Sequence, residues 1–434
     1  MFLRTTAAIV ALATASPAFG QDDLAAAVER DWQENLEDLF LHFHQNPELS
    51  FREFETAKRL AAELTELGYE VTTGVGRTGV VAVLENGEGP TVMVRADMDG
   101  LPIKEDSGLD YQSEALQEDI DGVVKPVMHA CGHDVHITSL IGTARQMMAR
   151  RDDWSGTLVL IGQPAEERIS GAREMLEDGL YERFPRPDYA LALHVASDIP
   201  AGRIIVPRKN AYASSDSVDI KVYGIGGHGA SPHETIDPVL IASQIVVSLQ
   251  SVVSRTLAPK EAGVITVGSF HAGTKHNIIG EEAHLKLTVR SLDPEVRMKL
   301  LDGIDRVARG TAVAMGVPED KYPEVIRSKT ETTPPTNNDP ATAERVEKAI
   351  VAQMGEDVLI NIPDEGMGAE DFAYFVAPDL GVKGTYFAVG GGFPQDMDSP
   401  RPHHSPVFRV QPEPAVTHGT EAMTAAAMAL LAGS

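Results

Sequence analysis

Apolar runs of strand length alternate with amphipathic segments of helix length through the first half of this 434-residue chain. The strand-like runs are 69–73, 80–84, 91–95, 157–161 and 189–194, and the helical segments are 24–45, 53–68, 135–150 and 171–178. This alternation is typical of parallel strands joined by helices that cover both faces of a sheet. The pattern therefore predicts an α/β domain built on a mainly parallel sheet.

The order of elements changes between residues 208 and 329. It becomes strand, helix, strand, strand, helix and strand, at 217–223, 238–255, 263–271, 282–291, 294–314 and 322–328. This βαββαβ order is the ferredoxin-like arrangement, which is complete in itself. We therefore expect an inserted domain at 208–329. The first domain then comprises 21–207 and 330–434, with a further helix at 341–353 and a strand at 384–389.

The first twenty residues differ in character from the rest of the chain. A positive charge at Arg4 precedes an apolar run at 7–15, and small residues end the stretch at Gly20. This pattern predicts a secretory signal peptide cleaved after Gly20, and so a periplasmic or secreted protein. No later apolar run approaches the roughly 18 residues of a membrane span. The formal net charge of −27 argues against a nucleic-acid or anionic-membrane partner.

The only cysteine of the chain lies in a histidine-rich segment, residues 127–136. Cys131 and His133 flank a glycine, so a tight turn can direct both side chains to one point. Thiolate and imidazole are good ligands for borderline-soft divalent metals. A lone cysteine is also often a small buried hydrophobic residue. This segment alone therefore leaves metal binding and core packing both open.

Acidic residues and a histidine follow three of the predicted strands. Asp97 and Asp99 come after one strand, Glu166 and Glu167 come after another, and His194 ends a third. The carboxyl ends of strands in an α/β sheet are where functional groups gather. Neighbouring glutamates point in opposite directions in an extended segment. One of them can therefore bind a metal while the other accepts a proton from an activated water.

Two loops add further histidines. His404 lies in a proline-bounded loop, 402–406, and His228 lies in a glycine-rich loop, 224–233. The glycine-rich loop lacks a Walker lysine and does not open a nucleotide-binding βαβ unit, so it does not fit phosphate binding. It either presents His228 to a ligand or forms a plain hairpin turn.

The motifs of this chain together resemble those of a known family. In order they are ADMDGLP, MHACGHDVH, GQPAEE, ALHV, GGHGASPH, HNII, LTVRS, GAEDF and HHSPVF. The set is similar to that of the aminoacylase/carboxypeptidase G class of metallohydrolases, in particular its branch of hippurate hydrolases and plant indole-acetyl-amino-acid hydrolases. The resemblance spans essentially the whole chain after residue 20. It implies a metallohydrolase domain with an inserted lid and dimerisation domain.

The resemblance also implies a metal site. Two divalent ions, of manganese, zinc, cobalt or nickel, would be held by ligands corresponding to Cys131, His133, Glu167, His194 and His404. Glu166 corresponds to the general base, and Asp99 corresponds to a buried carboxylate near the metals. The wider class has an imidazole at the position of Asp97, so contact between Asp97 and a metal stays open.

Three residues of the inserted domain complete the implied site. His228 corresponds to a residue that reaches the partner subunit's active site and stabilises the oxyanion. Asn277 and Arg290 correspond to residues that bind the substrate carboxylate or the scissile carbonyl, and the arginine fork can bond both carboxylate oxygens. We therefore expect a homodimer formed through the inserted domain. An edge strand such as 217–223 is a candidate for pairing between the subunits.

These features predict a metal-dependent amidohydrolase that cleaves N-acyl amino acids with a metal-activated water. Glu166 would generate the nucleophile and then protonate the departing amino acid. A dipeptidase or carboxypeptidase on the same scaffold is an alternative, because the ligand set does not separate these activities. A thiol hydrolase using Cys131 would leave Glu167 and His404 without a role. A non-catalytic metal or amino-acid binding protein would not need Glu166.

Overall fold

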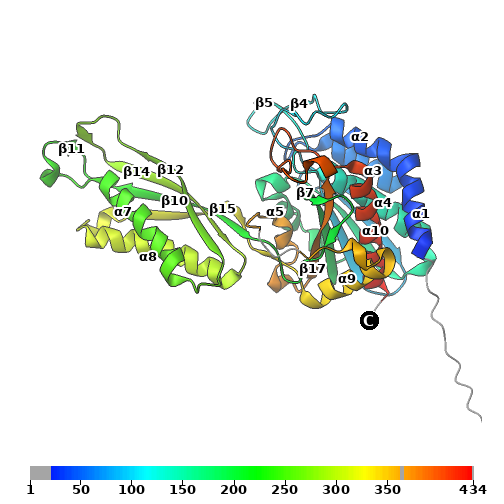
Figure 1. Ribbon diagram of the computed structural model, residues 1–434. Helices are drawn as coiled ribbons and strands as arrows, with labels where there is room; N and C mark the ends of the chain where they lie inside the picture. Colours follow the sequence, from blue (N-terminus) through cyan, green and yellow to red (C-terminus); the bar gives the residue numbers. More distant parts are fainter. Residues whose placement is uncertain (1–20, 362–365, 433–434) are drawn as a thin grey trace, which may run out of the picture.

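The computed structural model describes residues 21–361 and 366–432, so the predicted signal peptide at 1–20 lies outside the described residues. The main domain is built on a seven-stranded sheet in the order β1-β2-β6-β3-β7-β17-β8 (Figure 1). Its strands are β1 (Glu70–Val75), β2 (Gly79–Asn86), β3 (Thr91–Asp97), β6 (Gly156–Gln163), β7 (Tyr189–Pro200), β8 (Ile204–Ile205) and β17 (Lys383–Gly392).

The centre of this sheet is parallel. Strands β6, β3, β7 and β17 run in one direction, whereas β2 pairs antiparallel with β6 and with β1, and β8 pairs antiparallel with β17. The predicted α/β class with a mainly parallel sheet is therefore confirmed. Because parallel strands share an edge, the residues that follow β3 and β6 and the later part of β7 meet on one side of the domain.

Helices cover both faces of the sheet. They are α1 (Gln21–Asp31), which continues through the π-helical turn Trp32–Leu36 into α2 (Glu37–Gln45), and α3 (Phe54–Glu66), α4 (His133–Ala149), α5 (Gly171–Glu177), α6 (Leu180–Arg183), α9 (Pro340–Met354) and α10 (Pro412–Leu431). Along β3, Val92 and Val94 belong to one apolar core while Met93 belongs to the core on the opposite face. This alternation is expected for a strand that is buried on both sides.

Helix α10 was not predicted from the sequence. It is buried between α4 and α9, and most of its residues are buried, including Val416, Ala422 and Leu430. Its polar residues, such as Thr417 and Glu421, are buried as well, so polar and apolar positions do not separate into an exposed face and a buried face. Its composition is dominated by alanine, threonine and methionine, which gives no strong strand or helix signal by spacing.

The inserted βαββαβ unit forms its own four-stranded antiparallel sheet, with the order β12-β14-β10-β15. Its elements are β10 (Ser214–Tyr223), α7 (Pro238–Ser251), β12 (Gly263–Ala272), β14 (Glu282–Ser291), α8 (Pro294–Ala314) and β15 (Glu324–Thr333). The sheet and the two helices enclose a separate apolar core. Both helices begin at an aspartate, Asp237 or Asp293, whose side chain accepts N–H bonds from the first turn, with proline at the next position.

The suggestion that strand 217–223 lies at an edge is wrong. This strand is part of β10, which is paired on both sides, with β14 and with β15. The edges of the inserted sheet are β12 and β15. Sequence alone shows which residues form a strand but not the order in which strands pair.

The inserted unit extends away from the main domain (Figure 1). Two short paired strands, β9 (Asn210–Tyr212) and β16 (Thr336–Asn337), lie where the chain passes between the two. At the far end, β11 (Gly227–His228) pairs with β13 (Ile278–Ile279). A hairpin of β4 (Leu116–Glu118) and β5 (Val124–Pro126) projects from the main domain.

One helix in the described part of the chain is long and apolar enough to span a membrane. It is α7 with its π-helical extension, Pro238–Thr256, which has a mean hydropathy of 1.3. One face of this helix packs Ile241, Ile245 and Leu249 into the core of the inserted unit. Its outer face leaves Leu240 and Val247 exposed. Helix α7 therefore packs one apolar face into the core of the inserted unit and exposes apolar residues on its other face.

Candidate metal centre

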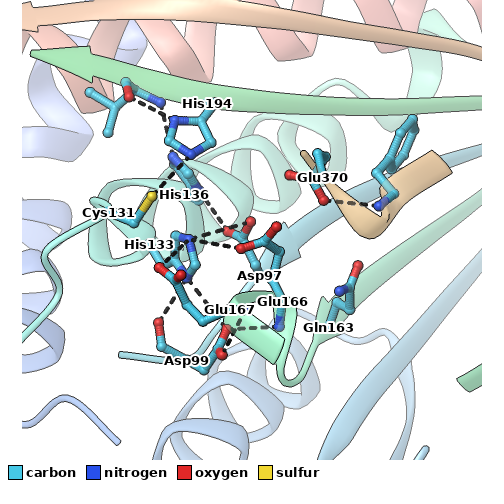
Figure 2. Close-up of polar contacts among 12 residues, drawn as sticks. Asp97, Asp99, Cys131, His133, His136, Gln163, Glu166, Glu167, His194 and Glu370 are labelled. Atoms are coloured by element: carbon cyan, nitrogen blue, oxygen red, sulfur yellow. Dashed lines mark hydrogen bonds and ion pairs between the residues drawn. The ribbon is translucent and has the colours of Figure 1, made fainter. Parts of the chain in front are cut away.

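The turn before α4 packs directly on β7. Gly132 has a φ of +85°, and a Cβ at this position would lie 2.3 Å from Cγ1 of Val195. Only glycine combines this backbone conformation with this close approach. The turn therefore brings Cys131 against β7, where its Sγ lies 3.4 Å from Nε2 of His194. Figure 2 shows Cys131, His133 and His194 grouped beside the carboxylates that follow β3 and β6.

The hydrogen bonds of His133 and His194 define which nitrogen of each ring is available to a ligand. Nδ1 of His133 lies 2.7 Å from the carbonyl oxygen of Asp99, and Nδ1 of His194 lies 2.7 Å from that of Val195. A carbonyl only accepts, so each Nδ1 carries the hydrogen and each Nε2 presents a lone pair. Metal-binding histidines are commonly oriented in this way.

The predicted ligands form two triads that share one residue. Cys131, His133 and His194 make one group, and Cys131, Glu167 and His404 make the other, with the ligand atoms of each group within 4.8 Å of one another. Nε2 of His133 and Oε1 of Glu167 are buried and have no hydrogen-bond partner. Buried polar atoms are normally satisfied, so these two orphan atoms fit a site that takes metal ions.

His404 enters the site in a strained conformation. Its φ of +58° is rare for a residue with a side chain, and its backbone N–H donates to the carbonyl of Ala130 at 2.9 Å. This backbone bond ties the 402–406 loop to the turn that carries Cys131. Nε2 of His404 consequently lies 3.3 Å from Oε2 of Glu167.

Asp99 fixes the glutamate pair. Its Oδ1 accepts the backbone N–H of Glu166 at 3.0 Å, and its Oδ2 accepts that of Glu167 at 3.1 Å and the hydroxyl of Ser50 at 2.6 Å. The preceding residue, Ala165, has a φ of +49°. Asp99 therefore holds a strained turn that points the two glutamates into the site.

Asp97 supports the site from behind His133. Its Oδ2 accepts from the guanidinium of Arg95 at 2.7 Å and lies 3.7 Å from Nε2 of His133. Its Oδ1 lies 2.6 Å from Nδ1 of His136, whose Nε2 accepts the backbone N–H of Val195 at 2.9 Å. Both carboxylate oxygens thus have protein partners, and Asp97 also forms, with His133 and His136, a further group of side chains that could hold a metal ion.

The site carries a surplus of buried acid. Burial, and then the negative charges of Glu370 and Glu167, hold the pKa of Glu166 well above its ordinary value. Burial raises the pKa of Glu167 to about 8 and holds that of the Cys131 thiol well above its usual range. Among the described residues, Arg95 is the only buried lysine or arginine. Divalent cations would compensate this charge and favour the deprotonated ligands.

The two triads open into a cavity of about 460 Å³. Its walls include Glu166, Tyr212 and Glu370 in addition to four of the five predicted ligands, Cys131, Glu167, His194 and His404. Arg290 reaches the same cavity from β14 of the inserted unit, and its Nη1 donates to the carbonyl of Met367 at 3.3 Å. The structure therefore brings Arg290 to the candidate centre.

His228 and Asn277 lie elsewhere. The backbone N–H of Gly229 donates to the carbonyl of Asn277 at 2.9 Å, so the two loops that carry these residues are joined to each other. These loops include β11 and its partner strand β13, and β11 lies at the end of the inserted unit farthest from the main domain (Figure 1). Neither residue lines the cavity of its own chain.

A family model described as peptidase family M20/M25/M40 matches residues 93–429. The chain belongs to this family. The hippurate hydrolase of Campylobacter jejuni is 38% identical over 349 residues, which are 80% of this chain and 86% of that protein. Thermostable carboxypeptidase 2 of Saccharolobus solfataricus is 37% identical over 377 residues, 85% of this chain and 89% of that one. The resemblance inferred from the motifs is confirmed.

A solved structure agrees with this assignment. Bacillus subtilis YXEP, a dinuclear metal binding peptidase of the M20 family, matches with a TM-score of 0.76 and 29% identity, covering 94% of this chain and 99% of that one. As a member of the M20/M25/M40 family, this chain is a metal-binding hydrolase that acts on amide bonds.

Sequence reasoning missed the buried network behind the family's metal centre. Arg95 donates to Asp97, to Oε1 of Glu370 at 2.7 Å and to Oε1 of Gln163 at 2.7 Å, and the hydroxyl of Tyr386 donates to Oε2 of Glu370 at 2.7 Å. An arginine inside the apolar run 91–96 was the available signal, because a buried arginine needs partners. Apart from Asp97 on the same strand, these partners come from β6 and from the segment before β17, and the spacing of residues in the sequence does not show which residues they are.

Proposed function

We propose that this chain hydrolyses the amide bond of N-acyl amino acids with two divalent ions bound at its metal centre. The observation that carries the proposal is the arrangement of one cavity. The two triads that share Cys131 open into the same 460 Å³ space as Glu166 and Arg290. A metal-activated nucleophile, a proton carrier and a carboxylate-binding group are the parts that this reaction needs.

The residues would divide the two ions between the triads. One ion would be held by Cys131, His133 and His194, and the other by Cys131, Glu167 and His404. This mixture of sulfur, nitrogen and oxygen ligands suits manganese, zinc, cobalt or nickel. When bound, the ions supply Lewis acidity and lower the pKa of a coordinated water.

Glu166 is the proposed proton carrier. Its backbone is fixed by Asp99, its side chain lines the cavity, and its pKa is held high by burial and neighbouring carboxylates. A carboxylate with a raised pKa accepts a proton from water and then returns it to the departing amino group near neutral pH.

Arg290 is the proposed anchor for the substrate carboxylate. Its guanidinium contacts the hydroxyl of Thr288 at 3.3 Å and the carbonyl of Met367 at 3.3 Å. These contacts leave donors of its planar fork for the carboxylate of an N-acyl amino acid. Because Arg290 comes from the inserted unit, closing of this unit over the main domain would tighten that grip.

A homodimer would complete the site. His228 is too far along the inserted unit to serve its own cavity, so we propose that it stabilises the oxyanion in the partner's cavity, with Asn277 beside it. The free edge of β12 and the exposed Leu240 and Val247 of α7 are surfaces suited to pairing with a second copy. We also propose export to the periplasm or beyond, on the strength of residues 1–20.

Subunit complementation tests the dimer. The Glu166→Gln variant and the His228→Ala variant should each be inactive alone. The two are mixed, and their subunits are exchanged by reversible dissociation. If His228 acts on the partner's cavity, random pairing gives one intact site in each mixed dimer, and about a quarter of the wild-type activity returns. If His228 acts within its own chain, every site lacks one group and mixing restores nothing.

A substrate panel tests the reaction. Amino-acid release is measured with N-benzoylglycine, N-acetylmethionine, an indole-acetyl conjugate and two dipeptides, first with chelator and then with Mn²⁺ or Zn²⁺ restored. Metal-restored cleavage of the acyl amino acids is the expected result. Cleavage of the dipeptides alone would move the assignment to a peptidase, an alternative supported by the similarity to a thermostable carboxypeptidase.

A further inference from the structure

The histidine before the proposed ligand His404 also reaches the metal centre. His403 lines the cavity, and its Nδ1 lies 3.7 Å from Sγ of Cys131. Neither of the two triads contains it. Its position beside the one ligand that the triads share therefore needs its own explanation.

The other ring nitrogen of His403 settles which one carries the hydrogen. The backbone N–H of Ser197 donates to Nε2 of His403, at 3.4 Å. Nε2 must then hold the lone pair, and the hydrogen of the ring resides on Nδ1. This is the opposite of His133 and His194, whose Nδ1 atoms donate to carbonyls and whose Nε2 lone pairs face the site. His403 turns a donor, not an acceptor, toward the sulfur.

The ring of His403 is fixed in this orientation by its surroundings. It packs on the ring of Phe408 with centroids 4.6 Å apart and meets the ring of His194 at 5.3 Å. The hydroxyl of Ser197 donates to the carbonyl of Arg401 at 2.6 Å, so β7 holds the 401–404 segment by two bonds from one residue. Rotation of the imidazole would break the Ser197 contact and leave a buried N–H without an acceptor.

We propose that His403 is a positioning residue that donates an N–H···S hydrogen bond from Nδ1 to the Cys131 thiolate. The inference rests on the proposed function, in which this thiolate is shared by two ions. A donor directed at the sulfur stabilises its negative charge and fixes the position from which it serves both triads, as hydrogen bonds to other metal ligands do. A role for His403 as a sixth ligand would need a lone pair on Nδ1, which would set Nε2–H against the N–H of Ser197.

Two substitutions separate the donor from the bulk of the ring. His403→Phe keeps an aromatic ring against Phe408 and removes the donor. His403→Asn places an amide N–H near the position of Nδ1 and restores the donor on a smaller side chain. Both variants and the wild type are loaded with Co²⁺, and the sulfur-to-cobalt charge-transfer absorption, the metal content and the Co²⁺ affinity by chelator competition are measured.

The expected result has three parts. His403→Phe binds as many ions as the wild type but about 10-fold more weakly, as for other partners of metal ligands. Its charge-transfer band moves to lower energy, because a thiolate without its hydrogen bond gives up electrons more readily. His403→Asn returns both the band and the affinity toward wild-type values.

Three results would overturn the inference. The first is an unchanged charge-transfer band in His403→Phe. The second is loss of a whole equivalent of metal in that variant, which would make His403 a ligand. The third is a wild-type protein that shows no sulfur-to-cobalt band. These readouts do not depend on turnover. Wild-type protein that shows the band yet hydrolyses nothing in the substrate panel would refute the proposed function while leaving the hydrogen bond in place.

Discussion

Arg95 and Glu370, which are 275 positions apart in the chain, form a fully buried ion pair directly behind the metal centre, with Nη2 of the arginine 2.7 Å from Oε1 of the glutamate. The same guanidinium also bonds Asp97. It thereby ties β3 of the sheet to the segment before β17, and Glu370 in turn lines the cavity. The positive charge that holds these acids together is thus supplied by one side chain.

We expect Arg95→Met to destabilise the fold by about 3–5 kcal/mol, because it leaves the buried carboxylates of Asp97 and Glu370 without the positive charge of the guanidinium. Urea unfolding of the chelator-treated protein measures the change. Arg77→Met is the matched control, since Arg77 pairs with Glu174 at an exposed site and should contribute no more than about 1 kcal/mol. Equal stability losses in the two variants would contradict a special role for the buried pair.

The shared position of Cys131 predicts an uneven loss of metal among ligand variants. Cys131→Ala should lose both ions, because it belongs to both triads, whereas Glu167→Ala and His194→Ala should each retain about one ion per chain. Metal analysis after gel filtration counts the ions. Retention of one ion by Cys131→Ala would show that the two sites do not share the sulfur.

Gly132→Ala tests the contact between the cysteine turn and β7. The new methyl group would clash with Val195, and the alanine would have to adopt a left-handed backbone conformation. The variant should therefore be less stable and bind metal more weakly. Gly108→Ala is the control, because Gly108 also has a positive φ, +76°, but has open space around its Cβ position. The control should cost about 1 kcal/mol from the backbone alone, and Gly132→Ala should cost at least about 1 kcal/mol more. Equal losses of stability in the two variants would mean that Val195 can move away from the new methyl group at little energetic cost.

His44 predicts a specific pH dependence of stability. Although burial alone would lower it, hydrogen bonds to Asp134 and Glu105 raise the pKa of His44 to about 9, from 6.5 in the unfolded chain. A raised pKa in the folded state stabilises the protein fully below the unfolded value and is lost as the pH rises through the folded one. The stability gap between wild type and His44→Gln should therefore shrink by about 3 kcal/mol from about pH 6 to about pH 10.

Chelator-treated protein is suited to this comparison, because metal binding has a pH dependence of its own. Urea midpoints at four or more pH values define the gap. A gap that stays constant with pH would show that the His44 imidazole is not charged in the folded protein.

The sequence was informative where chemistry concentrates in short segments. Cys131 and His133 lie two apart in one turn, and the glutamate pair follows β6, so local pattern and sheet topology together indicated the site. The predicted strand end at His194 was wrong, because β7 continues to Pro200, but His194 still belongs to the site. The inserted βαββαβ unit could also be predicted from the sequence, because its helices begin at capping residues and apolar and polar residues alternate along its strands.

The remaining features depend on contacts between distant segments. The interior place of β10, the pairing of Arg95 with Glu370 and the tautomer of His403 are each decided by partners far along the chain. Helix α10 escaped detection for the opposite reason. Most of its residues are buried, polar ones included, so its sequence lacks the contrast between a solvent-exposed polar face and a buried apolar face by which helices are recognised.

The most direct test of the central claim is a metal titration of N-benzoylglycine hydrolysis by chelator-treated wild-type protein, with Glu166→Gln in parallel. We predict that wild-type activity rises until about two ions are bound per chain. The variant should take up the same number of ions with activity at least about 100-fold lower. Undiminished hydrolysis in excess chelator, or equal activity of the two proteins at equal metal content, would contradict the account.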